Sequence, residues 1–212
     1  MKLLQSIGPN PRVVMMFIAE KNIALPRQVI DIVAGQNRQG EYLAKNPAGG
    51  TPALELDNGT WLPDSVAICE YLEELHPQPP LIGANPQERG QTRAILRQID
   101  HGVVVPLTSG FRSSEGLAMF RDRMLVRPDA ADALKAYAQE GLATIERRLA
   151  AGGPYLCGAR FSLADIVLFC FVDFGTLVGQ PLDHAFTHLK SWLLRVGERP
   201  SAAVSANPAN GT

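Results

Sequence analysis

GGTPALELDNGTWLPDSVAICEYL, residues Gly49–Leu72, combines two short apolar runs with the start of an apolar helix. The runs Ala53–Leu56 and Thr60–Leu62 are expected to be strands, because Asp57-Asn58-Gly59 between them is typical of a hairpin turn. An apolar run follows the polar pair Asp64-Ser65 and predicts a helix over Asp64–Leu75. The stretch therefore predicts a β-hairpin that leads directly into a helix.

The residues before this stretch predict a strand, a helix, a second strand and a short helix. Asn10 is expected to cap the first helix, and Pro11 suits its first position, where a missing N–H costs nothing. The expected ranges are 2–5 for the first strand, Pro11 to about Asn22 for the first helix, Val29–Val33 for the second strand and Gly40–Lys45 for the short helix. Together with the hairpin and its helix, they give the order βαβαββα.

A proline-rich segment, His76–Pro86, separates this part from one in which only helices are expected. The predicted organisation is a first domain over residues 1–76, a linker over 77–86 and an all-helical domain over 87–212. Its helices are expected over Gln87–Thr108 with a bend at Pro106, 115–126, Asp129–Ala151, Ser162–Val178 and Ala185–Val196. The tail 205–212 has no apolar periodicity and is expected to be loose.

The composition excludes several classes of protein. With 46% hydrophobic and 19% charged residues and a net charge of -1, the 212-residue chain predicts a folded protein without a nucleic-acid partner. No apolar run is long enough for a membrane span or a signal peptide, so a cytoplasmic protein with no membrane partner is predicted. The cysteines Cys69, Cys157 and Cys170 are widely spaced, which favours reduced core residues over a metal site.

Ser162 and Asp165 open the most apolar of the expected helices. The spacing matches a variant of the capping box, in which Ser162 caps the helix and Asp165 reaches back to the Ser162 N–H. The competing interpretation is a catalytic serine. The structural interpretation is favoured, because a buried helix needs its first N–H groups satisfied.

Four motifs in this order resemble the cytosolic glutathione transferase family. They are NPAGGTPAL (Asn46–Leu54), LPDSVAICEYL (Leu62–Leu72), YLCGARFSLADI (Tyr155–Ile166) and WLLRVGERPS (Trp192–Ser201). The resemblance covers nearly the whole chain and is to bacterial enzymes of the serine or asparagine type rather than the tyrosine type. It implies an α/β thioredoxin-like N-terminal domain, an all-α C-terminal helical bundle domain and a homodimer.

The resemblance also implies where glutathione binds as co-substrate. The bond before Pro52 is expected to be cis, so that the main chain of Thr51 pairs with the cysteinyl residue as in strand addition. Ser65, on the first turn of a helix, is expected to bind the γ-glutamyl carboxylate, and Asp64 the nearby ammonium. The alternative for this pair is a plain helix cap, which is compatible with binding.

The loop after the first strand departs from the family pattern, because Gly8 stands where bacterial relatives have a serine or threonine before Pro-Asn. Asn10, through its amide, and Ser6, through its hydroxyl, remain as candidates to stabilise the thiolate. Asn10 is favoured, although it could be structural only. No tyrosine precedes Tyr42 and no cysteine precedes Cys69, which argues against a tyrosine-type enzyme and against a thioredoxin-like dithiol mechanism in this loop.

A second departure is Gly50, at a place where relatives often carry a basic side chain or glutamine for the glycyl end of glutathione. Arg38, Gln39 and Arg12 are candidate substitutes, and a solvated surface role is the alternative for each. The predicted function is thiolate attack on a small apolar electrophile, or glutathione-dependent disulfide reduction, without a metal. Phe111, Phe120 and Met124 could line the electrophile site or belong to the core. A glutathione-dependent isomerase or dehalogenase and a non-catalytic glutathione-binding member are the rival interpretations.

Overall fold

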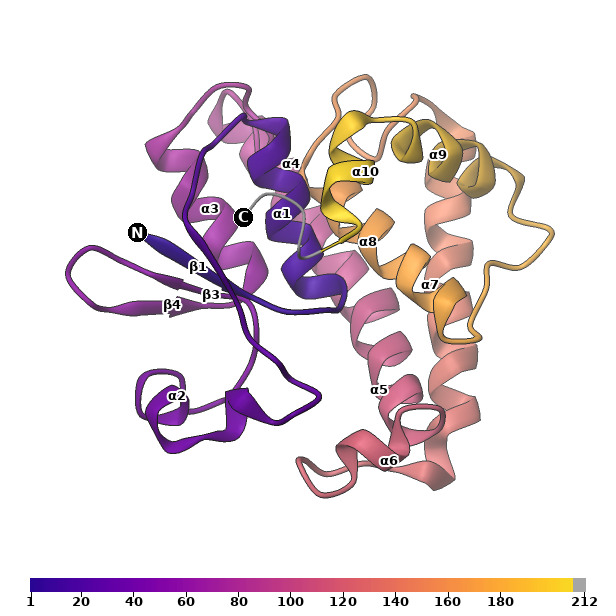
Figure 1. Cartoon of the computed structure of the whole chain (residues 1–212). Helices are drawn as coiled ribbons and strands as arrows, with labels where there is room; N and C mark the ends of the chain where they lie inside the picture. Colours follow the sequence, from indigo (N-terminus) through magenta and orange to yellow (C-terminus); the bar gives the residue numbers. More distant parts are fainter. Residues whose placement is uncertain (208–212) are drawn as a thin grey trace. The chain divides into compact units, whose positions relative to one another are not determined.

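The computed structural model describes residues 1–207, which form two compact units (Figure 1). One unit contains Met1–Leu81 together with the C-terminal stretch from Glu198, and the other contains Ile82–Gly197. The segment over residues 198–207 was predicted to belong to the helical domain, but α10 (Pro200–Ser205) packs within the first unit. Most of the predicted loose tail, residues 208–212, lies outside the described residues. The predicted class, an α/β first part followed by helices only, is confirmed.

The first unit is a four-stranded mixed sheet with helices. Strand β1 is parallel to β2 and antiparallel to β3, and β3 is antiparallel to β4, which gives the order β2-β1-β3-β4. The elements are β1 (Lys2–Gln5), α1 (Pro9–Glu20), β2 (Arg27–Val29), a 3-10 turn (Gln36–Arg38), α2 (Gly40–Lys45), β3 (Ala53–Glu55), β4 (Trp61–Pro63), α3 (Ser65–Leu75) and α10 (Pro200–Ser205). The core between sheet and helices includes Leu3, Leu54, Phe17 and Ile68, none of which is exposed.

The predicted hairpin and the helix after it are confirmed. Leu54 pairs with both Leu3 and Leu62, which fixes the register of the three antiparallel strands. Gly59 has a φ of 80°, a value that glycine adopts without steric cost. Local turn chemistry is therefore sufficient to place this part of the fold.

Helix α1 begins earlier than predicted, so the prediction that Asn10 caps it is wrong. The cap residue is Gly8, whose φ of 119° lies in the region that favours glycine, and Pro9 is the first helical residue. Pro9 suits that position as well as Pro11 does, because the first-turn N–H groups have no partner inside a helix. Asn10 consequently lies inside the first turn, with its side chain free for another role.

The second strand was also predicted in the wrong place. It ends at Val29, because Asp31 accepts hydrogen bonds from the N–H groups of Val33 and Ala34 at 3.0 and 2.9 Å. A side chain that binds its own backbone in this way forms a turn instead of a strand. The predicted range 29–33 therefore covers the last strand residue and the turn after it.

The second unit contains only helices: α4 (Pro86–Ile99), a π turn (Asp100–Val104), α5 (Val105–Ser113), α6 (Leu117–Phe120), a 3-10 turn (Pro128–Ala130), α7 (Ala131–Ala151), α8 (Leu163–Leu177) and α9 (Thr187–Gly197). The long helix predicted over Gln87–Thr108 is interrupted by the π turn just before Pro106. Pro106 lacks the N–H of a regular helical bond, and such sites interrupt a helix. A side chain on Gly141 would approach the carbonyl oxygen of Gly102 within 2.0 Å, so the π turn and α7 meet through their backbones.

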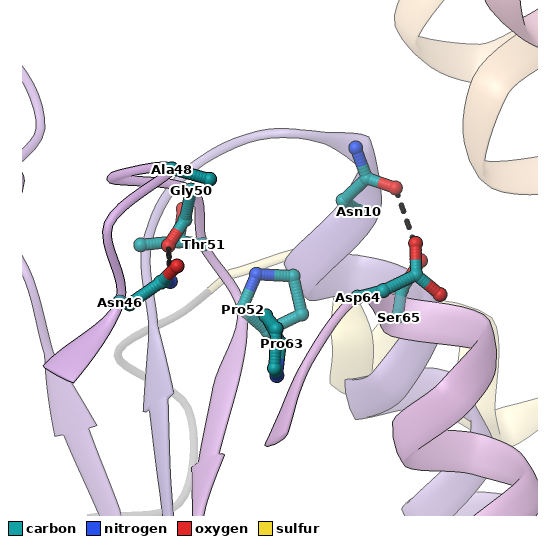
Figure 2. A pocket seen from close by; sticks show the side chains of 9 residues that line it. All are labelled: Asn10, Asn46, Ala48, Gly50, Thr51, Pro52, Pro63, Asp64 and Ser65. Atoms are coloured by element: carbon teal, nitrogen blue, oxygen red, sulfur yellow. Dashed lines mark hydrogen bonds between the residues drawn. The ribbon is translucent and has the colours of Figure 1, made fainter. Parts of the chain in front are cut away.

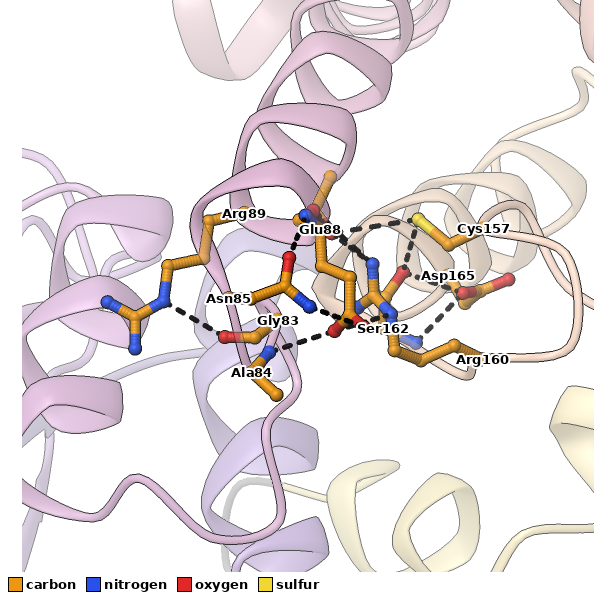
Figure 3. A network of polar contacts seen from close by, with 10 residues as sticks. Gly83, Ala84, Asn85, Glu88, Arg89, Cys157, Arg160, Ser162 and Asp165 are labelled. Carbon is orange, nitrogen blue, oxygen red and sulfur yellow. Dashed lines mark hydrogen bonds and ion pairs between the residues drawn. The ribbon is translucent and has the colours of Figure 1, made fainter.

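Helix α8 begins with the predicted capping box (Figure 3). Asp165 Oδ2 accepts bonds from the Ser162 N–H at 3.0 Å and the Ser162 hydroxyl at 2.9 Å. Its Oδ1 accepts bonds from the Leu156 N–H and the Trp192 indole, both at 2.9 Å. The serine is therefore structural, and one buried carboxylate joins α8 to α9 and to the loop before α8.

The start of α4 lies in the same network (Figure 3). Asn85 accepts a bond from the Glu88 N–H at 3.0 Å, and Glu88 in turn accepts one from the Ala84 N–H at 2.9 Å. The Arg160 guanidinium donates to the Thr92 hydroxyl at 2.8 Å and lies 3.6 Å from the Glu88 carboxylate.

In residues 1–207, no helix combines the length and the apolar character that crossing a membrane requires.

Candidate functional site

A pocket of about 260 Å³ opens in the first unit, where the loop before β3 meets the first turns of α1 and α3 (Figure 2). Residues from three segments that are far apart in the sequence meet there. The pocket is lined by Asn10, Asn46, Ala48, Gly50, Thr51, Pro52, Pro63, Asp64 and Ser65. Five of the nine predicted site residues are thus brought together: Asn10, Thr51, Pro52, Asp64 and Ser65.

The first turn of α3 forms one side of the pocket. Asp64 is its cap residue, and Asp64 Oδ1 accepts bonds from the N–H groups of Val66 and Ala67 at 2.9 and 3.0 Å. The Ile68 N–H bonds to the Asp64 carbonyl, so among the first four amides of this helix that of Ser65 has no partner within the helix. An amide at the positive end of a helix dipole is suited to bind an anion.

Asp64 also has an unusual backbone, with a φ of 77°. Residues other than glycine rarely adopt such values, and they persist where the surrounding structure enforces them. The conformation turns the chain sharply from β4 into α3, which places the Ser65 amide at the pocket. The side chain of Ser65 itself is almost completely buried, with 4% exposure.

Asn10 lies opposite this turn, on the first turn of α1. Its side-chain oxygen accepts a hydrogen bond of 3.0 Å from the Ser65 hydroxyl. Figure 2 shows that the amide nitrogen consequently points away from Ser65. The contact fixes the orientation of the amide, with both N–H groups available to an acceptor.

Thr51 and Pro52 form the middle of the pocket, directly before β3. The Thr51–Pro52 bond is cis, as predicted. Neither the N–H nor the C=O of Thr51 takes part in a hydrogen bond among the described residues. A peptide could therefore pair with this main chain in the manner of an added strand.

Ser6 is close to the pocket but does not line it. Its side chain is buried, with 3% exposure, and its hydroxyl lies 2.5 Å from the Thr51 hydroxyl. It also donates to the carbonyl oxygen of Ile7 at 3.0 Å. The Ser6 hydroxyl is thus committed to holding the loop after β1 against Thr51.

The turn over residues 46–50 closes the other side of the pocket and was largely missed by the sequence predictions. Both the Asn46 amide and the Tyr42 hydroxyl donate to the Gly50 carbonyl, at 2.9 and 2.6 Å. Burial raises the pKa of the Tyr42 hydroxyl, which keeps it a donor. The NPAGGTPAL motif was the signal for this turn, but it does not reveal which of its residues face a ligand.

Three predicted basic or polar residues do not line the pocket: Arg12, Arg38 and Gln39. The Arg38 guanidinium packs against Gly49, and Gln39 is exposed at the start of α2. In the second unit, Phe111 makes edge-to-face contacts with Phe120 and Phe174, at centroid distances of 6.0 and 5.1 Å. Met124 is partly exposed.

The fold combines an α/β unit that carries the pocket with a unit of helices, and comparisons with known proteins identify the family. The chain matches the glutathione S-transferase N-terminal domain over residues 6–80 and the C-terminal domain over residues 128–195, together more than half of its length. The structure resembles that of a glutathione S-transferase domain-containing protein of Marinobacter aquaeolei VT8, with a TM-score of 0.89 and 31% identity, over 95% of this chain and all of that one.

Two curated proteins illustrate the range of relatives. Glutathione S-transferase 2 of Saccharomyces cerevisiae is 29% identical over 92% of this chain and 84% of its own. Maleylacetoacetate isomerase of Pseudomonas aeruginosa is 49% identical over a shorter stretch of 61 residues, 29% of each chain. The chain therefore belongs to the glutathione S-transferase family, and its first unit has the thioredoxin-like fold.

Proposed function

We propose that this protein is a glutathione transferase of the asparagine type, in which Asn10 activates the thiol. The observation that carries this proposal is the meeting of three different groups in one pocket: the Thr51 main chain, the first turn of α3 and the oriented amide of Asn10. An extended thiol peptide can use all three at once. Family membership supports glutathione as that peptide.

The proposed binding mode assigns one group to each part of glutathione. The γ-glutamyl carboxylate accepts the Ser65 N–H at the start of α3, where the helix dipole favours an anion. Asp64 uses Oδ1 for its cap, which leaves Oδ2 for the neighbouring ammonium. The cysteinyl residue pairs with the N–H and C=O of Thr51 beside Pro52.

The chemical step requires the thiolate, because a free thiol has a pKa near 8.5 and is mostly protonated at neutral pH. Lowering that pKa by about two units takes roughly 2.7 kcal/mol of preferential stabilisation of the anion. A hydrogen bond to a charged group contributes about 1.5–3 kcal/mol, so the Asn10 amide and the dipole of α1 suffice together. The thiolate then attacks an electrophilic carbon and displaces its leaving group, or attacks a disulfide and releases one of its sulfurs as a thiolate. The family resemblance implies that this takes place in a cytoplasmic homodimer.

A thiolate titration tests the enzyme proposal. Glutathione bound to the wild-type protein is expected to show a thiol pKa about two units below that of the free tripeptide, followed by thiolate absorbance against pH. Asn10→Ala is expected to restore an unshifted pKa and to reduce turnover of an activated aryl halide, whereas Ser6→Ala keeps the shift. If Asn10→Ala leaves both the pKa and the turnover unchanged, the assignment of the thiolate to Asn10 is wrong.

A second candidate is a member of the family that binds glutathione without catalysis. The observation that favours it is the Ser6 hydroxyl, which is committed to Thr51 and Ile7, so that the loop after β1 offers no hydroxyl to the thiol. Saturable binding of glutathione with an unshifted thiol pKa would support this candidate. A glutathione-dependent isomerase would share the same pKa shift and differ in its second substrate, and the local match to an isomerase supports that variant of the enzyme.

A further inference from the structure

The end of the pocket at the 46–50 turn has no basic side chain among its lining residues. Among its nine lining residues, the only ionisable side chain is Asp64, which lies at the opposite end, on α3. Figure 2 shows Ala48 and Gly50 on one side of Pro52, with Asn10 and Ser65 on the other. The two ends of the pocket therefore differ in the groups that they offer to bind an anion.

The two polar side chains that bond to Gly50 are already engaged. The Asn46 amide and the Tyr42 hydroxyl both donate to the Gly50 carbonyl, at 2.9 and 2.6 Å. The Arg38 guanidinium lies where a Gly49 side chain would be, with Nη1 2.9 Å from that position, and Arg38 does not line the pocket. No lining side chain at this end is therefore placed to form an ion pair with a carboxylate.

Gly50 is not required by the backbone or by packing, in contrast to Gly49. Gly49 has a φ of 62°, and a side chain on it would collide with Arg38. Gly50 has no such positive φ, and a Cβ built on it meets nothing within 4 Å. The missing side chain at position 50 therefore leaves the end of the pocket open.

We infer that this end accepts the third residue of the thiol peptide without an ion pair, so that the protein also uses γ-glutamylcysteinyl peptides whose C-terminal carboxylate is amidated or extended. The inference rests on the proposed function. Once the first carboxylate binds at α3 and the cysteinyl residue pairs with Thr51, the remaining residue falls beside Ala48 and Gly50. A carboxylate held there by a charged donor would contribute roughly a tenfold gain in affinity, and the lining offers none.

Calorimetric titration of the full chain with two ligands tests the inference. Glutathione and glutathione amidated at its glycyl carboxylate are expected to bind with dissociation constants within about threefold of each other, less than one charge-assisted bond contributes. If glutathione binds and the amide binds tenfold more weakly or worse, the inference is wrong and the proposed function stands. If neither peptide binds, the proposed function itself fails.

Two variants at the open position make the test specific. Gly50→Lys places an ammonium at this end and is expected to create a preference of about tenfold for glutathione over its amide. Gly50→Met has a side chain of similar length without charge, and it is expected to leave the two affinities equal. The inference is overturned if Gly50→Lys creates no preference or if Gly50→Met creates the same one. Far-ultraviolet circular dichroism and the thermal midpoint check that both variants are folded.

Discussion

The Ser65 hydroxyl donates a hydrogen bond of 3.0 Å to the side-chain oxygen of Asn10 and so joins the first turns of α3 and α1. The residue whose N–H is proposed to bind the glutathione carboxylate thus orients, through its hydroxyl, the side chain proposed to bind the sulfur. Removing the Ser65 hydroxyl should therefore affect the sulfur of the ligand and leave the carboxylate contact in place.

Ser65→Ala is expected to change glutathione affinity by less than about threefold, because the N–H proposed to bind the carboxylate is retained. It is also expected to raise the pKa of the bound thiol, because the Asn10 amide is no longer held. Calorimetry and the thiolate titration measure the two effects, with Ser191→Ala on the surface of α9 as the control. A thiol pKa that does not respond to Ser65→Ala would show that Asn10 needs no partner.

Asp64 combines a helix cap with a proposed contact to the ligand ammonium, and two substitutions separate these roles. Asp64→Asn retains an oxygen for the Val66 and Ala67 amides, so it is expected to preserve stability and to lose glutathione affinity. Asp64→Ala is expected to lose both, with about 1 kcal/mol of unfolding free energy from the cap. Urea denaturation and calorimetry on the same samples provide the comparison. Unchanged affinity in Asp64→Asn would remove the ammonium contact from the binding mode.

Asp165 is fully buried and accepts four hydrogen bonds, among them that of the Trp192 indole. Asp165→Ala leaves these donors unsatisfied and is expected to lower the unfolding free energy by about 3 kcal/mol or more. Trp192 fluorescence during urea denaturation reports the change, and Glu140→Ala, an exposed change on α7, is the control. A loss below about 1 kcal/mol would mean that water replaces the carboxylate.

Lys21 and Glu73 form a buried ion pair of 2.6 Å, in which the Lys21 side chain is fully buried. Its ammonium also donates to the carbonyl oxygens of His76 and Pro79, at 2.6 and 2.7 Å. Lys21→Met is expected to cost about 3–5 kcal/mol, because the buried Glu73 carboxylate loses the ammonium that pairs with it. Adding Glu73→Leu should recover part of that loss. Equilibrium denaturation of the single and double variants measures their free energies of unfolding. A double variant that loses the full sum would contradict this account.

Glu20 makes a bidentate ion pair with Arg199, at 2.7 and 2.6 Å, and accepts a hydrogen bond from Ser201. Burial alone would raise the pKa of Glu20, but the bonds from Arg199 and Ser201 outweigh burial and lower it below the ordinary value of 4.5. The pair therefore stabilises the folded state above that value and loses its contribution as the pH falls through the lowered pKa.

Glu20→Gln is expected to destabilise the protein by about 2 kcal/mol at neutral pH and to have a progressively smaller effect in acid. Urea midpoints of both proteins between about pH 3 and pH 7 measure the difference. A difference that stays constant down to the acid end would mean that Glu20 is not the titrating group.

The hairpin and helix α3 were predictable, because turn residues such as Gly59 act within a few positions of the chain. The start of α1 was not, since Pro9 and Pro11 both fit a first helical turn and only the conformation of Gly8 decides between them. β2 was displaced because the Asp31 side chain competes with strand pairing.

The sequence predicted several residues that line the pocket, but it did not predict which of them contact each other. Asn10 and Ser65 are 55 positions apart, and Ser6 and Thr51 are 45 apart. No local sequence pattern shows that the Ser65 hydroxyl donates to the Asn10 side chain, whereas the Ser6 hydroxyl bonds to that of Thr51. These pairings depend on the order of strands in the sheet, which places the ends of β1, β3 and β4 side by side.

The contact between Glu20 and Arg199 has a consequence for the synthesis of this protein. Arg199, at the start of α10, lies 179 positions after Glu20, and α10 packs against α1, so α10 must be synthesised before the first unit is complete. Domains usually fold in the order in which they are made. Here every residue of the helical unit, Ile82–Gly197, is synthesised before α10, so that unit can fold while the first unit is still incomplete.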